Sequence, residues 1–428
     1  MLKKLTDFLE GKHRKLWLVS GSITWKECMI LLISLLGVRS IVEGEAIKKY
    51  EQEFRRYLGA KYAFSFGAGR MAFYAILKAI GVEKGDEVIL PGYTCVVVPD
   101  AVIYCGAKPV YVDIDRSTLN IDVSKIEEKL SPRTKVICAQ HTSSSFCKME
   151  EIMKIAKKHD LKVIEDCAHA LGAEYNGKKA GNFGHAAYFT TEQSKIISTG
   201  MGGVAVTNDA KIATRIQEIQ ANSDPQDDWT SKKVALQILL FYFIFHPSMH
   251  FFDKYAWMLM NKFHLYVEST TKEELEGQRP KKYPVKLSNI QAKLGLAQLK
   301  RIQSNLQHRR EIAKIYEGWL RIHGYEVPTD DDDRYEPSYI RYWFLVDDKE
   351  KFIETFYLNG IELGEWFECP VHPRATSLKN VFYEMGSCPI AEYVVQHNVN
   401  LPTHLKVNAK DAKRVIRILE LLSQNKGS

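Results

Sequence analysis

Residues 163–170 are the most informative segment of the chain and read Val163-Ile164-Glu165-Asp166-Cys167-Ala168-His169-Ala170. Its apolar beginning predicts a buried strand that carries Asp166 to its carboxyl end. Because open α/β sheets bind ligands at that edge, we expect Asp166 to face a ligand there. A carboxylate at this place can hold a ring nitrogen in its protonated form, or it can cap the next turn. The residues alone leave both interpretations open.

Short β-branched runs alternate with helical patterns around this strand, from about Ala60 to Asp209. This alternation predicts an α/β fold with a mostly parallel sheet. Lys148 to Lys158 carry apolar residues at helical spacing, which predicts a helix just before the strand Val163–Asp166. This helix and this strand complete one crossover unit. The predicted strands are Glu87–Leu90, Val110–Ile114, Lys135–Gln140, Val163–Asp166, Ala186–Thr190 and Val204–Thr207.

The second half of the chain predicts a bridging helix and a smaller domain. Apolar residues at helical spacing begin at Leu287 and continue, with a kink, towards Leu320. A strand at Tyr342–Val346 and a terminal helix at Asn408–Leu422, with Asn408 as its N-cap, follow an acidic connection. A chain of 428 residues is long enough for two or three such domains.

Composition excludes several classes of protein. The 59 basic and 52 acidic residues give a net charge of +7 that is dispersed along the chain, so we expect no nucleic-acid partner. The 8 cysteines lack CxxC spacing, which favours free thiols in a reducing cytoplasm, and we predict no metal. Lys3 and Lys4 are not followed directly by an apolar segment, so we expect no secretory signal and a cytoplasmic protein.

A lone lysine, Lys195, lies between two apolar strands and is followed by Gly202-Gly203. A lysine that forms a Schiff base must be partly desolvated, so that its amine is neutral often enough to attack. A surface lysine is the usual alternative for any single Lys.

A glycine turn, Gly67-Ala68-Gly69-Arg70, opens a helical pattern upstream. Free N–H groups at a helix N-terminus form a ready cradle for a phosphate, to which Arg70 or Thr190 could add donors. A plain entry turn into the helix is the alternative.

Together these pieces resemble the pyridoxal-phosphate-dependent sugar aminotransferases of the DegT/StrS type, which have the fold type I of aminotransferases. The resemblance runs from about Ser40 to Leu422. It rests on ordered motifs, namely Gly85-Asp86-Glu87-Val88-Ile89-Leu90-Pro91, Gly106-Ala107-Lys108-Pro109-Val110, Thr118-Leu119-Asn120-Ile121-Asp122, Glu165-Asp166, Lys195 with Gly202-Gly203, and Gln291-Ala292-Lys293-Leu294-Gly295-Leu296-Ala297-Gln298-Leu299.

The resemblance implies a cofactor, pyridoxal 5'-phosphate, and a role for each site residue. Lys195 would form the Schiff base, Asp166 would pair with the pyridine nitrogen, and His169 would lie near the cofactor hydroxyl. Thr190 would hold the phosphate together with the turn formed by Ala68, Gly69 and Arg70. An aromatic residue of the family covers the cofactor ring, and Tyr93 is the aromatic available in Pro91-Gly92-Tyr93-Thr94-Cys95.

One departure from the family concerns the neighbouring subunit. The family's active sites lie at a dimer interface, so a homodimer is expected. However, the family's Asn that reaches the neighbour's phosphate falls on Pro284, and proline cannot supply that contact. Lys286, or a residue of the insertion, is the expected substitute that reaches the neighbouring phosphate.

A second departure is an insertion of about fifty residues, from Asp224 to Arg279. It carries an apolar run at 234–245, and further aromatic residues follow up to Met260. We expect residues 234–260, including Leu239, Leu240, Phe241, Phe243 and Phe245, either to contact a membrane surface peripherally or to be ordinary core. The runs are too short to span a bilayer.

The resemblance also implies the activity. We expect an aminotransferase that moves an amino group from an amino acid, by analogy glutamate, to a keto sugar carried by a nucleotide or a lipid, in glycan or cell-envelope biosynthesis. The alternatives are a sugar dehydratase or lyase, against which Lys195 argues, and a regulatory or scaffold protein without turnover. The predicted segments are an N-terminal arm (1–58), a large cofactor-binding α/β domain (59–223), the apolar insertion (224–284), a bridging helix (285–327) and a small α+β domain (328–428).

Overall fold

The computed structural model of the chain describes residues 14–19, 21–37, 40–143, 145–247, 258, 262, 267–328 and 333–424. Much of the aromatic continuation of the insertion, including Phe251 and Trp257, lies outside these residues, as does most of the acidic connection after Pro328.

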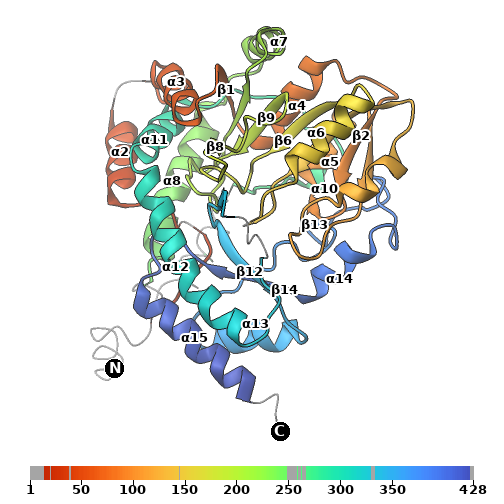
Figure 1. Cartoon of the computed structure of the whole chain (residues 1–428). Coiled ribbons are helices and arrows are strands. Elements are labelled where there is room, and N and C mark those ends of the chain that lie inside the picture. The colour runs from red at the N-terminus through yellow and green to blue at the C-terminus, as the bar shows by residue number, and fades with distance from the viewer. Residues whose placement is uncertain are drawn as a thin grey trace.

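A seven-stranded sheet forms the centre of the chain (Figure 1). In spatial order its strands are β1 (Tyr62–Phe66), β10 (Gly203–Thr207), β9 (Ala186–Thr190), β6 (Lys162–Asp166), β5 (Thr134–Gln140), β2 (Glu87–Pro91) and β4 (Lys108–Val112). Neighbours from β9 to β4 pair in parallel, whereas β10 pairs antiparallel with both β9 and β1. The sheet is therefore mostly parallel, and the predicted α/β fold is confirmed.

Helices cover both faces of the sheet, because parallel neighbours must be joined by crossovers. One buried core lies under α4 (Gly69–Ile80), α5 (Val97–Tyr104) and α7 (Ala210–Ala221), and the other lies under α3 (Ala46–Leu58) and α6 (Met149–Lys158). Successive residues of one strand serve opposite faces: Val88 and Leu90 belong to the first core, and Ile89 belongs to the second.

The bridging helix is in fact two helices, α11 (Asn289–Leu299) and α12 (Ile302–Ile322), separated at Lys300-Arg301. In Figure 1, α12 passes from the large sheet to the C-terminal part of the chain. There β12 (Arg341–Leu345) pairs antiparallel with β14 (Asn398–Pro402). The remaining elements of this part are α13 (Lys349–Leu358), α14 (Pro389–His397) and α15 (Ala409–Gln424), and the Asn408 side chain caps α15 as predicted, accepting the Asp411 N–H at 3.0 Å.

Short elements complete the described chain. Strand β3 (Thr94–Cys95) pairs in parallel with β13 (Val371–His372), which ties the C-terminal part to the large sheet. A small sheet contains β7 (Glu174–Tyr175), β8 (Lys178–Lys179) and β11 (Tyr335–Glu336), and two 3₁₀ turns are η1 (Val123–Lys125) and η2 (Glu127–Lys129).

The insertion contributes α8 (Asp228–Ile244) and α10 (Lys272–Leu275), and α8 packs against α2 (Trp25–Leu36) and α11. Leu239 and Phe241 are only 7% and 3% exposed. These two side chains therefore follow the ordinary-core alternative, because the inner face of α8 is buried within the chain. Phe243 is 41% exposed and lies on the outer face.

Candidate active site

A cavity of about 380 Å³ opens at the carboxyl ends of β5 and β6, at the edge where the sequence places a ligand. All the predicted site residues except Tyr93 line it. They are Ala68, Gly69, Arg70, Asp166, His169, Thr190 and Lys195.

Asp166 ends β6 and is only 2% exposed. Its Oδ1 accepts the Ala168 N–H at 2.9 Å, which fixes the orientation of the carboxylate. Burial raises the pKa of the Asp166 carboxyl, while the charge of Lys195 opposes that rise. A carboxylate held in this way can pair with a cationic N–H group that enters the cavity.

Lys195 is half-buried, and its Nζ lies 5.0 Å from the centroid of the Trp366 ring. Burial lowers the pKa of the Lys195 ammonium, and the carboxylate of Glu192 opposes this effect. A lowered pKa increases the fraction of neutral amine, which is the nucleophilic and basic form.

Buried amide side chains hold the loop that carries Lys195. Gln298 accepts the Ser198 N–H at 2.9 Å and donates to the Ser198 carbonyl at 2.6 Å. Gln291 donates to the Met201 carbonyl at 2.7 Å, and Asn305 donates to the Ile196 carbonyl at 2.7 Å. Helices α11 and α12 therefore position the lysine loop through hydrogen bonds to its backbone.

The N-terminus of α4 opens onto the cavity without a side-chain cap, because its N-cap residue is Ala68. A Cβ on Gly69 would lie 2.7 Å from the Cβ of Thr190, and a Cβ on Gly203 would lie 2.4 Å from the Ala68 carbonyl oxygen. Glycine at both positions therefore allows the helix end to approach β9 and β10. The uncapped N–H groups suit a phosphate, and beside them the Thr190 hydroxyl, which here donates to the Gly202 carbonyl at 3.2 Å, could turn to add a donor.

Arg70 lines the cavity, but its guanidinium is already paired. Its Nε lies 2.5 Å from the Glu274 carboxylate, and its Nη1 donates to the Ser269 carbonyl at 2.8 Å. The side chain of Arg70 is thus directed to the insertion, and only its backbone belongs to the helix N-terminus.

His169 presents a neutral ring to the cavity. Its Nδ1 accepts the Ser143 N–H at 3.3 Å, so the neutral ring carries its proton on Nε2. Burial lowers the pKa of His169 well below 6.5, and the ring lies nearly parallel to that of Trp366 at 6.2 Å. Nε2–H is therefore available as a donor to a ligand hydroxyl.

Tyr93 is a correction to the predicted site. It is fully buried, its hydroxyl donates to the Trp366 carbonyl at 2.7 Å, and the same oxygen accepts the Phe367 N–H at 2.6 Å. The side chain of this segment that lines the cavity is Cys95.

Several lining residues were not identified from the sequence. Gln140 ends β5 just as Asp166 ends β6, so the end of that predicted strand was an available signal. Trp366 and His372 come from the C-terminal part, and no local sequence pattern indicates that they lie near the end of β6. Ser269 and Thr270 come from the insertion.

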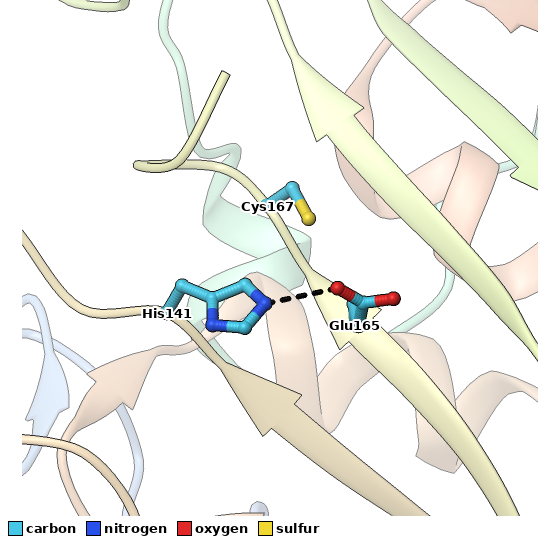
Figure 2. Close-up of side chains that lie close together, drawn as sticks. All are labelled: His141, Glu165 and Cys167. Atoms are coloured by element: carbon cyan, nitrogen blue, oxygen red, sulfur yellow. Dashed lines mark hydrogen bonds and ion pairs between the residues drawn. The ribbon is translucent and has the colours of Figure 1, made fainter. Parts of the chain in front are cut away.

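His141, Glu165 and Cys167 form a group with metal-like spacing among the described residues (Figure 2). Their hydrogen bonds point to a structural role. Glu165 accepts the His141 Nε2–H at 3.1 Å and the N–H groups of Gly181, Phe183 and Gly184 at 2.7–2.8 Å. His141 Nδ1 accepts the Cys147 N–H at 3.2 Å. The group therefore anchors the loop before β9 beneath the site.

Comparison with known proteins identifies the class. The model of the DegT/DnrJ/EryC1/StrS aminotransferase family matches residues 27–243 and 253–420, and the chain belongs to this family. The protein is thus an aminotransferase of a family that depends on pyridoxal phosphate, and the acid, lysine and donor set described above fit that cofactor.

Particular relatives are similar along most of their length. GDP-perosamine synthase of Caulobacter vibrioides is 30% identical over 96% of this chain and 95% of its own. The dTDP-3-amino-3,6-dideoxy-alpha-D-galactopyranose transaminase of Aneurinibacillus thermoaerophilus is 31% identical over 87% and 89%. An aminotransferase structure from Psychrobacter cryohalolentis covers 95% of this chain and 98% of its own at a TM-score of 0.73 and 22% identity, which shows the fold.

Replacing Gln298 with Ala should lower the free energy of unfolding by about 2 kcal/mol, because the Ser198 N–H and carbonyl would stay buried without partners. Chemical denaturation measures this change. Gln303→Ala, on the exposed side of α12, is the matched control and should leave stability within about 0.5 kcal/mol of wild type. Equal stability of the two variants would contradict the role assigned to Gln298.

Proposed function

We propose that this aminotransferase transfers an amino group from an amino acid, glutamate, to the keto group of a nucleotide- or lipid-linked sugar in glycan or cell-envelope biosynthesis. The observation that carries the proposal is one cavity that contains Lys195 with a lowered pKa, the buried Asp166 carboxylate and the uncapped N-terminus of α4. Relatives that act on GDP- and dTDP-linked sugars support the substrate class.

The bound cofactor would be held by residues of this cavity. The N–H groups at Ala68-Gly69-Arg70 and the hydroxyl of Thr190 would bind its phosphate, and His169 Nε2–H would donate to its hydroxyl. Asp166 would keep its pyridine nitrogen protonated by electrostatic attraction. Pyridoxal phosphate, when bound, supplies an electron sink for the negative charge that develops on the carbon losing its proton.

Lys195 acts as nucleophile and general base. Its amine is neutral more often than that of an exposed lysine, so with the cofactor bound it would serve first as the nucleophile that holds the cofactor. Once displaced by the donor amine, it would serve as the base that takes the proton from the carbon bearing that amine and later gives it back. The keto sugar takes up the amino group by the reverse sequence.

Lys195→Ala should abolish turnover and remove the visible absorption of lysine-linked cofactor, because no other amine of the loop can take its place. Absorption spectra before and after borohydride reduction, together with a transamination assay, measure both effects. Lys211→Ala, at an exposed lysine of α7, is the control and should behave as wild type. A borohydride-sensitive band that survives in Lys195→Ala would refute the assignment.

Asp166→Asn should still bind cofactor but lose roughly 100-fold or more in turnover, because a neutral amide cannot stabilise the protonated pyridine nitrogen. Stopped-flow measurement of the half-reaction with glutamate isolates this effect from the second substrate. A half-reaction at the wild-type rate would move the role of Asp166 to another group.

We also propose a homodimer, a cytoplasmic location and peripheral contact with the inner face of a membrane, and we retain the division into segments given by the sequence. Among the described residues, no helix is both long and apolar enough to cross a membrane. An apolar stripe on the outer face of α2 supports the membrane contact. It continues onto α8 through an edge-to-face pair of Trp25 and Phe243, whose ring centroids lie 6.4 Å apart. The stripe consists of Trp25, Met29, Leu32, Ile33 and Leu36, which are 37–85% exposed.

The double change Ile33→Asp and Leu36→Asp should reduce binding to vesicles that contain anionic lipid by at least about tenfold, because it places two charges where apolar area would leave water. Flotation at low salt measures binding. Leu358→Asp, at a residue 75% exposed on α13, is the control. A wild-type protein that does not float, or a double variant that floats equally, would end the membrane proposal.

A further inference from the structure

The insertion contributes directly to the active-site cavity of its own chain. Glu268, Ser269, Thr270 and Leu275 line the cavity together with Arg70 at the start of α4. Residues 267–283 will be called the insertion wall. Its side chains stand beside the same helix N-terminus that the proposed function assigns to the cofactor phosphate.

A buried ion pair joins the insertion wall to this helix. The side chains of Arg70 and Glu274 are 9% and 1% exposed, and Arg70 Nε lies 2.5 Å from Glu274 Oε1. The second oxygen of Glu274 accepts the Thr271 N–H at 2.8 Å, which fixes the turn that precedes α10. Both charged groups are buried, so removing either one would leave the other charge in the interior without this partner.

Hydrogen bonds hold the rest of the wall on several sides. Tyr104 of α5 donates to the Gln278 carbonyl at 2.8 Å, and the Ser377 N–H donates to the Leu275 carbonyl at 2.9 Å. The Val267 N–H donates to the side chain of Gln237 on α8 at 2.8 Å. The wall is thus bound to the large sheet's helices, to the C-terminal part and to α8 within one chain.

The residues at the end of the wall do not extend toward the cavity. Pro284 has no polar side chain, and Lys286 Nζ donates to the Ala221 carbonyl at 2.8 Å. Within its own chain Lys286 is thus bound to the end of α7, whereas Ser269 and Thr270 line the cavity, and a contact of Lys286 with a neighbouring subunit stays a prediction.

We propose that the insertion completes each active site from the same chain, with the Arg70–Glu274 pair as its clasp and Glu274 as a positioning residue. This inference rests on the proposed function, since it assumes that the cofactor phosphate lies at the N-terminus of α4. It replaces a contact expected from a neighbouring subunit with one supplied in cis.

The first test opens the clasp. Glu274→Gln keeps the shape of the side chain but removes the carboxylate that pairs with Arg70, which leaves Asp100 as its acidic neighbour and weakens the clasp, so cofactor should dissociate about tenfold more readily. Limited proteolysis of the cofactor-free protein should cut within 267–283 faster than in wild type. Glu273→Gln, on the exposed side of the same short helix, is the matched control and should change neither measurement. Wild-type proteolysis and wild-type cofactor affinity in Glu274→Gln would overturn the proposal.

The second test separates cis from trans. Two chains with different affinity tags, one Lys195→Ala and one Glu274→Gln, are co-expressed and the mixed dimer is isolated. If the wall acts in cis, the chain that keeps Lys195 has a defective wall, and the mixed dimer is no more active per Lys195 than the Glu274→Gln homodimer. If the wall acts in trans, the intact wall of the Lys195→Ala chain restores one full site.

The results that test the cis assignment differ from the results that test the proposed function. Restoration of one full site in the mixed dimer overturns the cis assignment while leaving the aminotransferase activity in place. A wild-type chain that light scattering shows to be monomeric, with full cofactor affinity, supports the cis assignment directly. A wild-type protein without lysine-linked absorption refutes the proposed function itself, whereas the proteolysis comparison of Glu274→Gln and Glu273→Gln still reports on the clasp.

Discussion

The position of Lys195 depends on amide side chains that bond the backbone of its loop, where no regular secondary structure does so. The segment from Ile196 to Met201 runs between β9 and β10 without regular pairing of its own, and it is largely buried. The backbone groups of Ile196, Ser198 and Met201 are bonded instead by Gln291, Gln298 and Asn305, which reach them from α11 and α12. Unpaired polar groups are costly in such a place, so these hydrogen bonds fix the loop in a single conformation.

The sequence was sufficient for the groups that lie on regular elements. Asp166 and Thr190 end predicted strands, and parallel strands bring their carboxyl ends to one edge, so their meeting in one cavity follows from the alternation alone. Tyr93 was misplaced because the family motif identifies a segment but not which of its side chains faces the cavity, and Tyr93 instead bonds the backbone of Trp366 and Phe367. The break between α11 and α12 was expected only as a kink, because apolar spacing continues across Lys300-Arg301.

Contacts between segments that lie far apart in the sequence could not be predicted from local patterns. An apolar count identifies α8 as unusual, but it does not distinguish Phe241, buried within the chain, from Phe243, which reaches the surface. Likewise, nothing in the Gly-Ala-Gly-Arg turn indicates that Arg70 finds its counter-charge about two hundred residues later, at Glu274. Pairings of this kind depend on the tertiary structure, and they decide which side chains remain available to a ligand.

The thiol of Cys95 gives the cavity a chemical selectivity. Cys95 is half-buried in the cavity lining, and burial raises its pKa to about 11, so at neutral pH it is almost entirely the weakly nucleophilic SH form. Lys195 in the same cavity is shifted in the opposite direction by the same cause. Desolvation thus suppresses the charged form of both groups, which weakens sulfur as a competitor and strengthens nitrogen. An aldehyde that enters this cavity therefore partitions toward the amine rather than toward a thiohemiacetal.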